Sequence, residues 1–258
     1  MSKRLLVISD PHAGHNAGLT HPDYWHDKKH PYGMHQRELW GFFDTALKMI
    51  GKVNMVVCDG DLIDGKGWRS GGVEQYTSDM DMQADMGAAI IDHVKANEAG
   101  LIYGTPYHTG DGEDWEKIAA DRAKTPIAFV SGQEWLKFSN CVFDFKHKVG
   151  GSSIPHGRMT AIARAKLWNN IWSLDGKQPN ADVLIRGHVH YHSFCGGPGW
   201  MAMTCPALQG FGSRYGVRQC EEEVHIGMIV FDVEKDGSYD WRPIIADLPQ
   251  QTAKVTVR

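Results

Sequence analysis

Three short apolar segments of this chain each run directly into residues that commonly bind metal ions. Residues 5–8 are followed by Ser-Asp-Pro-His, residues 53–58 by Asp-Gly-Asp-Leu-Ile-Asp, and residues 183–185 by Arg-Gly-His-Val-His. Apolar runs of this length predict buried strands. Because the carboxyl ends of strands in an open α/β sheet meet at one crevice, we expect the three polar segments to lie together. The expected meeting of the three polar segments favours an α/β fold with a ligand cluster at one edge of a sheet.

Helical and strand-like segments alternate in the first half of the chain. Apolar spacing predicts helices over 36–50 and 80–94, the second followed by Gly100 as its stop, and a short strand over 101–103. A further helix is predicted over 160–174.

The second half of the chain is richer in strand-like runs, and no composition break marks a linker. We therefore predict a single α/β domain over 1–258 with two packed mixed sheets flanked by helices. In the helix over 160–174 we interpret Trp168 and Trp172, four residues apart, as core residues.

Composition excludes several classes of protein. With 42% hydrophobic residues and a net charge of −4, the chain is expected to fold, and it lacks the strong positive charge of a long nucleic-acid clamp. The apolar runs are too short to span a bilayer or to form a signal-peptide core. Its five cysteines show no C-x-x-C spacing, which favours a reducing, cytoplasmic location over a disulfide framework.

The polar segments carry alternating ligand types. D-x-H and H-x-H place two side chains on the same side of an extended segment, so each can offer two ligands. Mixed carboxylate and imidazole sets suit Mn, Fe, Zn, Co or Ni. The candidate ligands in the three segments are Asp10, His12, Asp61, His188 and His190.

These motifs, in this order, resemble the calcineurin-like metallophosphoesterase family, whose signature runs D-x-H, G-D-x-x-D, G-N-H-[D/E], a later His, and G-H-x-H. The first, second and last segments match residue for residue. The resemblance implies a four-layer α/β/β/α sandwich that holds two divalent metal ions, with manganese expected and Fe, Zn, Ni or Co as alternatives. It implies that Asp61 bridges both ions, which makes it a catalytic residue as well as a ligand. Asp10, His12 and His190 would hold one ion, and His188 the other.

The family's fourth histidine has two candidates. His147 directly follows an alternating strand-like run, whereas His156 lies in a Ser-Ser-Ile-Pro-His-Gly segment. We expect His147 to be the metal ligand. His156 and Arg158 then form a candidate substrate-binding pair, with a plain surface loop as the alternative interpretation.

The third motif departs from the family pattern. After the strand-like run over 101–103 the chain reads Gly-Thr-Pro-Tyr-His, so Thr105 stands where the asparagine ligand is expected, and His108 lies two residues later than the family's histidine. We expect His108 to protonate the leaving group, although it could instead replace the missing ligand.

Together these features predict a hydrolase in which metal-bound hydroxide attacks a phosphodiester, in a nucleic acid or a nucleotide. The alternatives are a phosphomonoesterase, including a protein phosphatase, and a non-catalytic metal-binding scaffold. In the protein phosphatase branch Arg usually follows G-D-x-x-D. Here Gly65 and Lys66 follow Asp64, which counts against that branch. The expected partner is a phosphate ester rather than a membrane, and the sequence leaves the oligomeric state open.

Overall fold

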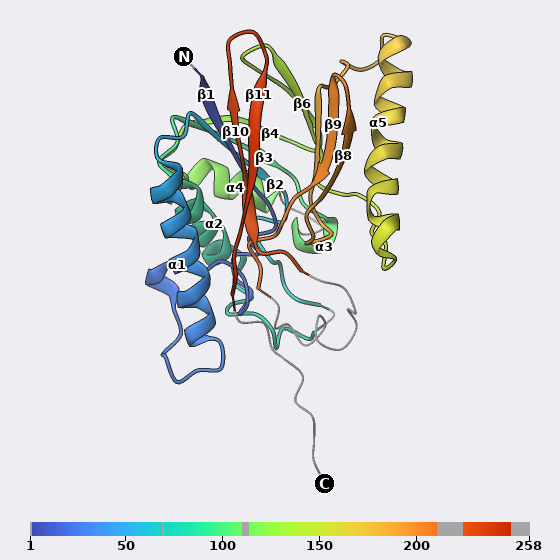
Figure 1. Cartoon of the computed structure of the whole chain (residues 1–258). Coiled ribbons are helices and arrows are strands. Elements are labelled where there is room, and N and C mark those ends of the chain that lie inside the picture. The colour runs from blue at the N-terminus through green and yellow to red at the C-terminus, as the bar shows by residue number, and fades with distance from the viewer. Residues whose placement is uncertain (1, 69, 110–113, 211–223, 249–258) are drawn as a thin grey trace.

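A computed structural model describes residues 2–68, 70–109, 114–210 and 224–248, which form two packed β-sheets with helices on the outer faces (Figure 1). The strands are β1 (Lys3–Ile8), β2 (Met55–Asp59), β3 (Glu98–Ile102), β4 (Ile127–Ser131), β5 (Glu134–Phe138), β6 (Cys141–Phe145), β7 (Val183–Arg186), β8 (Ser193–Gly197), β9 (Trp200–Thr204), β10 (Gly227–Val233) and β11 (Tyr239–Ile245). The helices are α1 (Gly33–Ile50), α2 (Met80–Val94), α3 (Pro106–Thr109), α4 (Trp115–Arg122) and α5 (Arg158–Leu174), with 3-10 turns η1 (Pro22–Tyr24) and η2 (Pro155–Gly157).

Both sheets are mixed. The first has the order β11-β10-β1-β2-β3-β4, with β1 to β4 parallel and the β10–β11 hairpin antiparallel to β1. The second has the order β5-β6-β7-β9-β8, in which β6, β7 and β9 are parallel. The predicted pair of mixed sheets flanked by helices is confirmed.

Alternation along the strands divides the core into layers. In β1, Leu6 and Ile8 pack into the cluster shared with α1, α2 and α4, whereas Leu5 and Val7 face the second sheet. On the outer face of the second sheet, Ile162 of α5 packs in a small third cluster. The order of layers is therefore helix, sheet, sheet, helix, and the carboxyl ends of β1, β2, β3 and β7 lie at one edge of the sandwich.

The expectation that Gly100 ends the helix over 80–94 is wrong. Helix α2 ends at Val94 and is capped by Lys95, whose backbone is left-handed, and Gly100 lies inside strand β3. A Cβ atom at Gly100 would lie 2.1 Å from Cζ of Phe129, so this glycine serves close packing between strands rather than helix termination.

Trp168 is not a core residue. It is 51% exposed, because α5 turns Ile162, Lys166 and Asn169 toward the sheet. The Lys166 ammonium is tolerated there because it donates to the Asn169 and Asn180 side chains and to the Ala181 carbonyl.

Two further expectations concern the membrane and the cysteines. Within the part of the chain that the structure covers, no helix combines the length and the apolar character needed to cross a bilayer. Four cysteines are free thiols, and the fifth, Cys220, lies outside the described residues.

Candidate metal centre

The predicted ligands lie in an unusual backbone conformation. Seven described non-glycine residues have positive φ, and five of them are ligand candidates, with φ between 46° and 72°. A left-handed backbone is rare outside glycine, and it concentrates at functional sites where the surrounding structure enforces it. Each polar segment thus turns sharply as it leaves its strand and directs its side chains into one space. The five residues are Asp10, His12, Asp61, His188 and His190.

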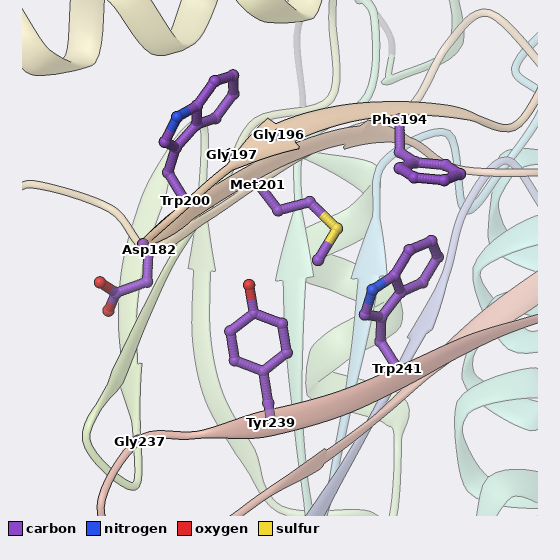
Figure 2. A pocket seen from close by; sticks show the side chains of 10 residues that line it. Asp182, Phe194, Gly196, Gly197, Trp200, Met201, Gly237, Tyr239 and Trp241 are labelled. Atoms are coloured by element: carbon purple, nitrogen blue, oxygen red, sulfur yellow. The ribbon is translucent and has the colours of Figure 1, made fainter.

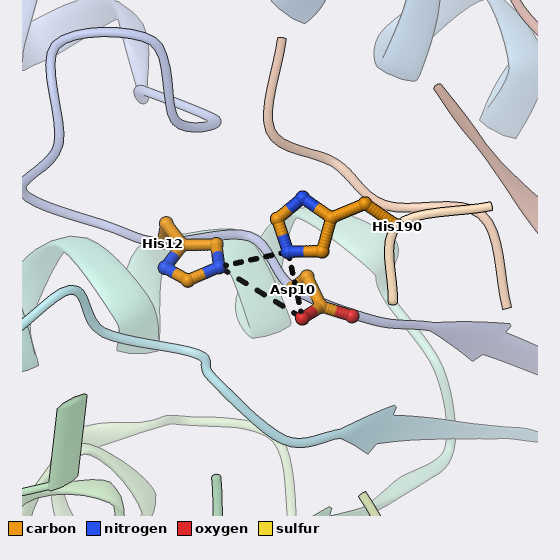
Figure 3. A group of neighbouring side chains, drawn as sticks. All are labelled: Asp10, His12 and His190. Carbon is orange, nitrogen blue, oxygen red and sulfur yellow. Dashed lines mark hydrogen bonds and ion pairs between the residues drawn. The ribbon is translucent and has the colours of Figure 1, made fainter. Parts of the chain in front are cut away.

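One group of possible ligands comprises Asp10, His12 and His190, shown in Figure 3. The two histidine Nε2 atoms are 3.3 Å apart, and they lie 3.8 Å (His12) and 3.1 Å (His190) from Oδ1 of Asp10. Asp10 is fully buried, and this Oδ1 accepts no hydrogen bond within the described parts of the chain. A buried carboxylate oxygen facing two imidazole nitrogens fits a cation between them.

A second group comprises Asp61, His147 and His188. Nε2 of His147 lies 2.9 Å from Oδ2 of Asp61, and Nδ1 hydrogen bonds with the Asp59 carbonyl. Burial lowers the pKa of His147, but the nearby carboxylates of Asp61 and Asp10 outweigh it and raise this pKa well above its usual value. These carboxylates therefore stabilise a positive charge at this position, which a divalent cation can supply.

A third group joins His12, Asp61 and His108. Nε2 of His108 lies 3.9 Å from Oδ2 of Asp61, and Nδ1 lies 2.6 Å from the Asp64 carbonyl oxygen. Burial is the main cause that lowers the pKa of His108, and the neighbouring His12 adds to it, against the pull of Asp61. The divergent third motif therefore does reach the site, because the short helix α3 carries His108 inward.

Hydrogen bonds with neighbouring residues fix the orientation of the candidate ligand side chains. Asp64 fixes His12 through an Nδ1 to Oδ1 contact of 2.9 Å, and Asp10 Oδ2 accepts from Ser9 Oγ and from the backbone N–H of His188. Metal-binding histidines usually hydrogen bond through their other ring nitrogen in this way. Asp64, which lies in none of the three groups, thus orients a ligand.

Glycine is required where the third motif meets Asp61. A Cβ atom at Gly104 would lie 2.0 Å from Oδ1 of Asp61. The next residue, Thr105, donates its backbone N–H to that same oxygen at 2.7 Å.

Glu116 is part of the site's support and was missed by sequence reasoning. It is fully buried on α4 and accepts hydrogen bonds from the backbone N–H groups of Leu62, at 3.2 Å, and of Gly104, at 3.0 Å. Burial, with a contribution from Asp61, raises its pKa to about 8. Nothing in the local sequence distinguishes this glutamate from a surface helix residue, because its partners are backbone groups 54 and 12 residues away.

The predicted substrate pair is divided. The Arg158 guanidinium stacks 4.5 Å from the ring of Tyr191, the residue that follows His190, which places it beside the G-H-x-H segment. His156 is exposed on η2 and belongs to none of the three groups. The structure thus places Arg158 against the residue that follows His190 and leaves His156 outside the three groups.

The donor set fits divalent metal ions. Within each of the three groups the candidate ligand atoms lie within 4.8 Å of one another, and they combine carboxylate oxygen with imidazole nitrogen. The chain thus combines the expected layered sandwich with three segments that resemble motifs of the calcineurin-like metallophosphoesterases, and the residues of these segments can form a metal centre.

No family model and no curated protein sequence matches this chain. Among solved structures, it is similar to a novel archaeal phosphodiesterase, with 13% identity, a TM-score of 0.49, and coverage of 94% of this chain and 99% of the other. Wild-type Vps29 complexed with Zn²⁺ from Entamoeba histolytica gives 17% identity and a TM-score of 0.44, with 94% and 98% covered. The Haemophilus influenzae NAD nucleotidase gives 12% identity and a TM-score of 0.45, with 95% and 50% covered.

Proposed function

We propose that this chain is a metal-dependent phosphoesterase and that it hydrolyses a phosphodiester in a nucleic acid or a nucleotide. The observation that supports this proposal most directly is the convergence of two ligand groups on one space, one around Asp10 and the other around Asp61. Such adjoining groups are typical of enzymes in which two metal ions act on one phosphate.

Asp10, His12 and His190 would hold one ion, His147 and His188 would hold a second, and Asp61 would contribute to both. When bound, such ions polarise the phosphoryl oxygens and lower the pKa of coordinated water, which provides the nucleophile. Manganese is our first choice, with Fe, Zn, Ni or Co as alternatives, because the ligands mix hard oxygen and borderline nitrogen donors.

The chain's own residues prepare the site for these ions. Backbone and carboxylate acceptors hold the Nδ1 protons of His12 and His147, so the Nε2 lone pair of each ring points into the cluster. The Arg158 guanidinium, which lies over the ring of the residue after His190, would attract the anionic substrate.

The substrate class depends on what surrounds the metals. The absence of Arg after Asp64 supports a diester over the protein-phosphatase alternative. The alternative of a non-catalytic scaffold is favoured by one observation, the threonine at position 105 in place of an amide ligand.

A comparison of two chromogenic substrates tests the proposal. With saturating Mn²⁺, bis(4-nitrophenyl) phosphate should be hydrolysed with a higher kcat/KM than 4-nitrophenyl phosphate, and EDTA should abolish both reactions. A preference for the monoester would support the phosphomonoesterase alternative. Stoichiometric metal binding without turnover of either ester would support the scaffold.

A further inference from the structure

Thr105 hydrogen bonds with the Asp61 carboxylate. Its backbone N–H donates to Asp61 Oδ1 at 2.7 Å, and its hydroxyl lies 3.4 Å from the same oxygen. A neutral hydroxyl is a poorer metal ligand than an amide oxygen, so Thr105 does not replace the amide ligand that the family has at this position.

The His108 ring has the orientation of a ligand. Its Nδ1 lies 2.6 Å from the carbonyl oxygen of Asp64. Because a carbonyl can only accept, Nδ1 carries the proton, and Nε2 of the neutral ring carries a lone pair. That Nε2 faces Oδ2 of Asp61 at 3.9 Å, a separation that leaves room for an ion to contact both atoms.

His147 repeats the same arrangement. Its Nδ1 hydrogen bonds with the Asp59 carbonyl, and its Nε2 faces the same Asp61 oxygen at 2.9 Å. A backbone carbonyl on Nδ1 with Nε2 toward the site is the usual arrangement for a histidine that binds a metal. By contrast, a proton donor at this position would need a proton on Nε2 as well, which the ring carries only in its doubly protonated form.

We propose that His108 is a metal ligand, acting with His12 and Asp61, and that it replaces the amide ligand absent at Thr105. This inference rests on the proposed metal centre and changes the role expected for His108 from proton donor to ligand. The divergent third motif then preserves the metal site by different residues: Thr105 holds the carboxylate in place and His108 supplies the missing donor atom.

The test is a count of ligating histidines in the Co²⁺-loaded protein. Each imidazole bound to Co²⁺ shifts its own exchangeable N–H proton strongly in the ¹H NMR spectrum. His108→Gln should remove one shifted exchangeable signal, and calorimetry should show at least about 10-fold weaker binding of one ion. His108→Ala should give the same result. His30→Ala is the matched control, because His30 lies outside all three ligand groups, and it should keep every signal.

Two outcomes would overturn the assignment. If His108→Gln keeps all shifted signals and the full metal affinity, His108 is not a ligand, although the proposed metal centre still stands. A loss of kcat confined to esters with poor leaving groups would then identify it as the proton donor. If the wild-type protein binds no Co²⁺ or Mn²⁺, the proposed function itself fails.

Discussion

The two ends of strand β7 carry different kinds of surface. The segment with the candidate ligands His188 and His190 follows its last residue, whereas Asp182, just before its first residue, lines a pocket of about 500 Å³ between the β8–β9 hairpin and β11. Figure 2 shows Met201 and Phe194 extending from the hairpin toward Tyr239 and Trp241 of β11. We call the end of β7 at the candidate metal centre the metal end. It is built from carboxylates and imidazoles, whereas the pocket is built mainly from aromatic rings, a thioether and glycines.

The two regions differ in their effect on the stability of the folded protein. At the metal end, five ligand candidates have left-handed backbones, and the fully buried Asp59 carboxylate accepts no hydrogen bond from described residues. In the pocket, Phe194 and Trp241 make an edge-to-face contact with ring centroids 5.0 Å apart, which is favourable without any ligand. The left-handed backbones and buried charge at the metal end are unfavourable by themselves, and a bound cation would offset the charge, whereas the pocket is a contact between the edge strands of two sheets.

The largest effect should come from Asp61→Asn. The amide keeps the acceptor for the Thr105 N–H but removes the negative charge that two of the three ligand groups share. We expect turnover of the diester to fall at least about 100-fold and metal binding to weaken with it. Metal content and kcat/KM at saturating Mn²⁺ measure this.

The control for that change is Asp240→Asn on the exposed side of β11, which should leave both quantities unchanged. Near wild-type hydrolysis by a metal-saturated Asp61→Asn protein would show that the metal end does not need the Asp61 charge. The functional contrast between the two ends of β7 would then be lost.

A smaller effect is expected from Glu116→Gln in the metal-free protein. The pKa of Glu116 is raised to about 8, so between the unfolded value near 4.5 and about pH 8 the folded state holds a proton that the unfolded state has released. Wild-type stability should therefore fall as pH rises through this window. The glutamine variant cannot release that proton, and its slope should be shallower by up to about 1.4 kcal/mol per pH unit.

Urea unfolding at several pH values in EDTA measures this slope. The glutamine carbonyl can still accept from the Leu62 and Gly104 N–H groups, so the variant should fold. Equal slopes for the two proteins would show that the buried Glu116 carboxyl is not the group that lowers the stability of the metal-free protein as pH rises.

The contrast also explains what the sequence could and could not predict. The candidate ligands after β1 and β2 were predictable because these adjacent parallel strands end at the same edge of one sheet. His190, by contrast, follows β7 of the second sheet and meets Asp10 through the packing of the two sheets. Glu116 was not predictable, since its partners are backbone groups whose positions depend on the folded loops. The pocket was not either, because β8, β9 and β11 meet only through the packing of two sheets. Gly100 was misassigned because a glycine that ends a helix and one that admits a neighbouring ring look alike in sequence.

The smallest effect on metal binding should come from a substitution in the pocket. Trp241→Ala removes a half-buried ring that contacts Phe194 and, with centroids 5.9 Å apart, His192. Loss of these contacts should destabilise the protein by about 2 kcal/mol, whereas Trp241→Phe, which keeps an aromatic ring, should retain most of the stability. Changes at separated sites are close to additive, so both variants should bind Mn²⁺ within about twofold of wild type. Urea unfolding with parallel calorimetry separates the two quantities. A marked loss of metal affinity in Trp241→Ala would mean that packing at the pocket reaches His190 through His192, and that the two ends of β7 form one coupled unit.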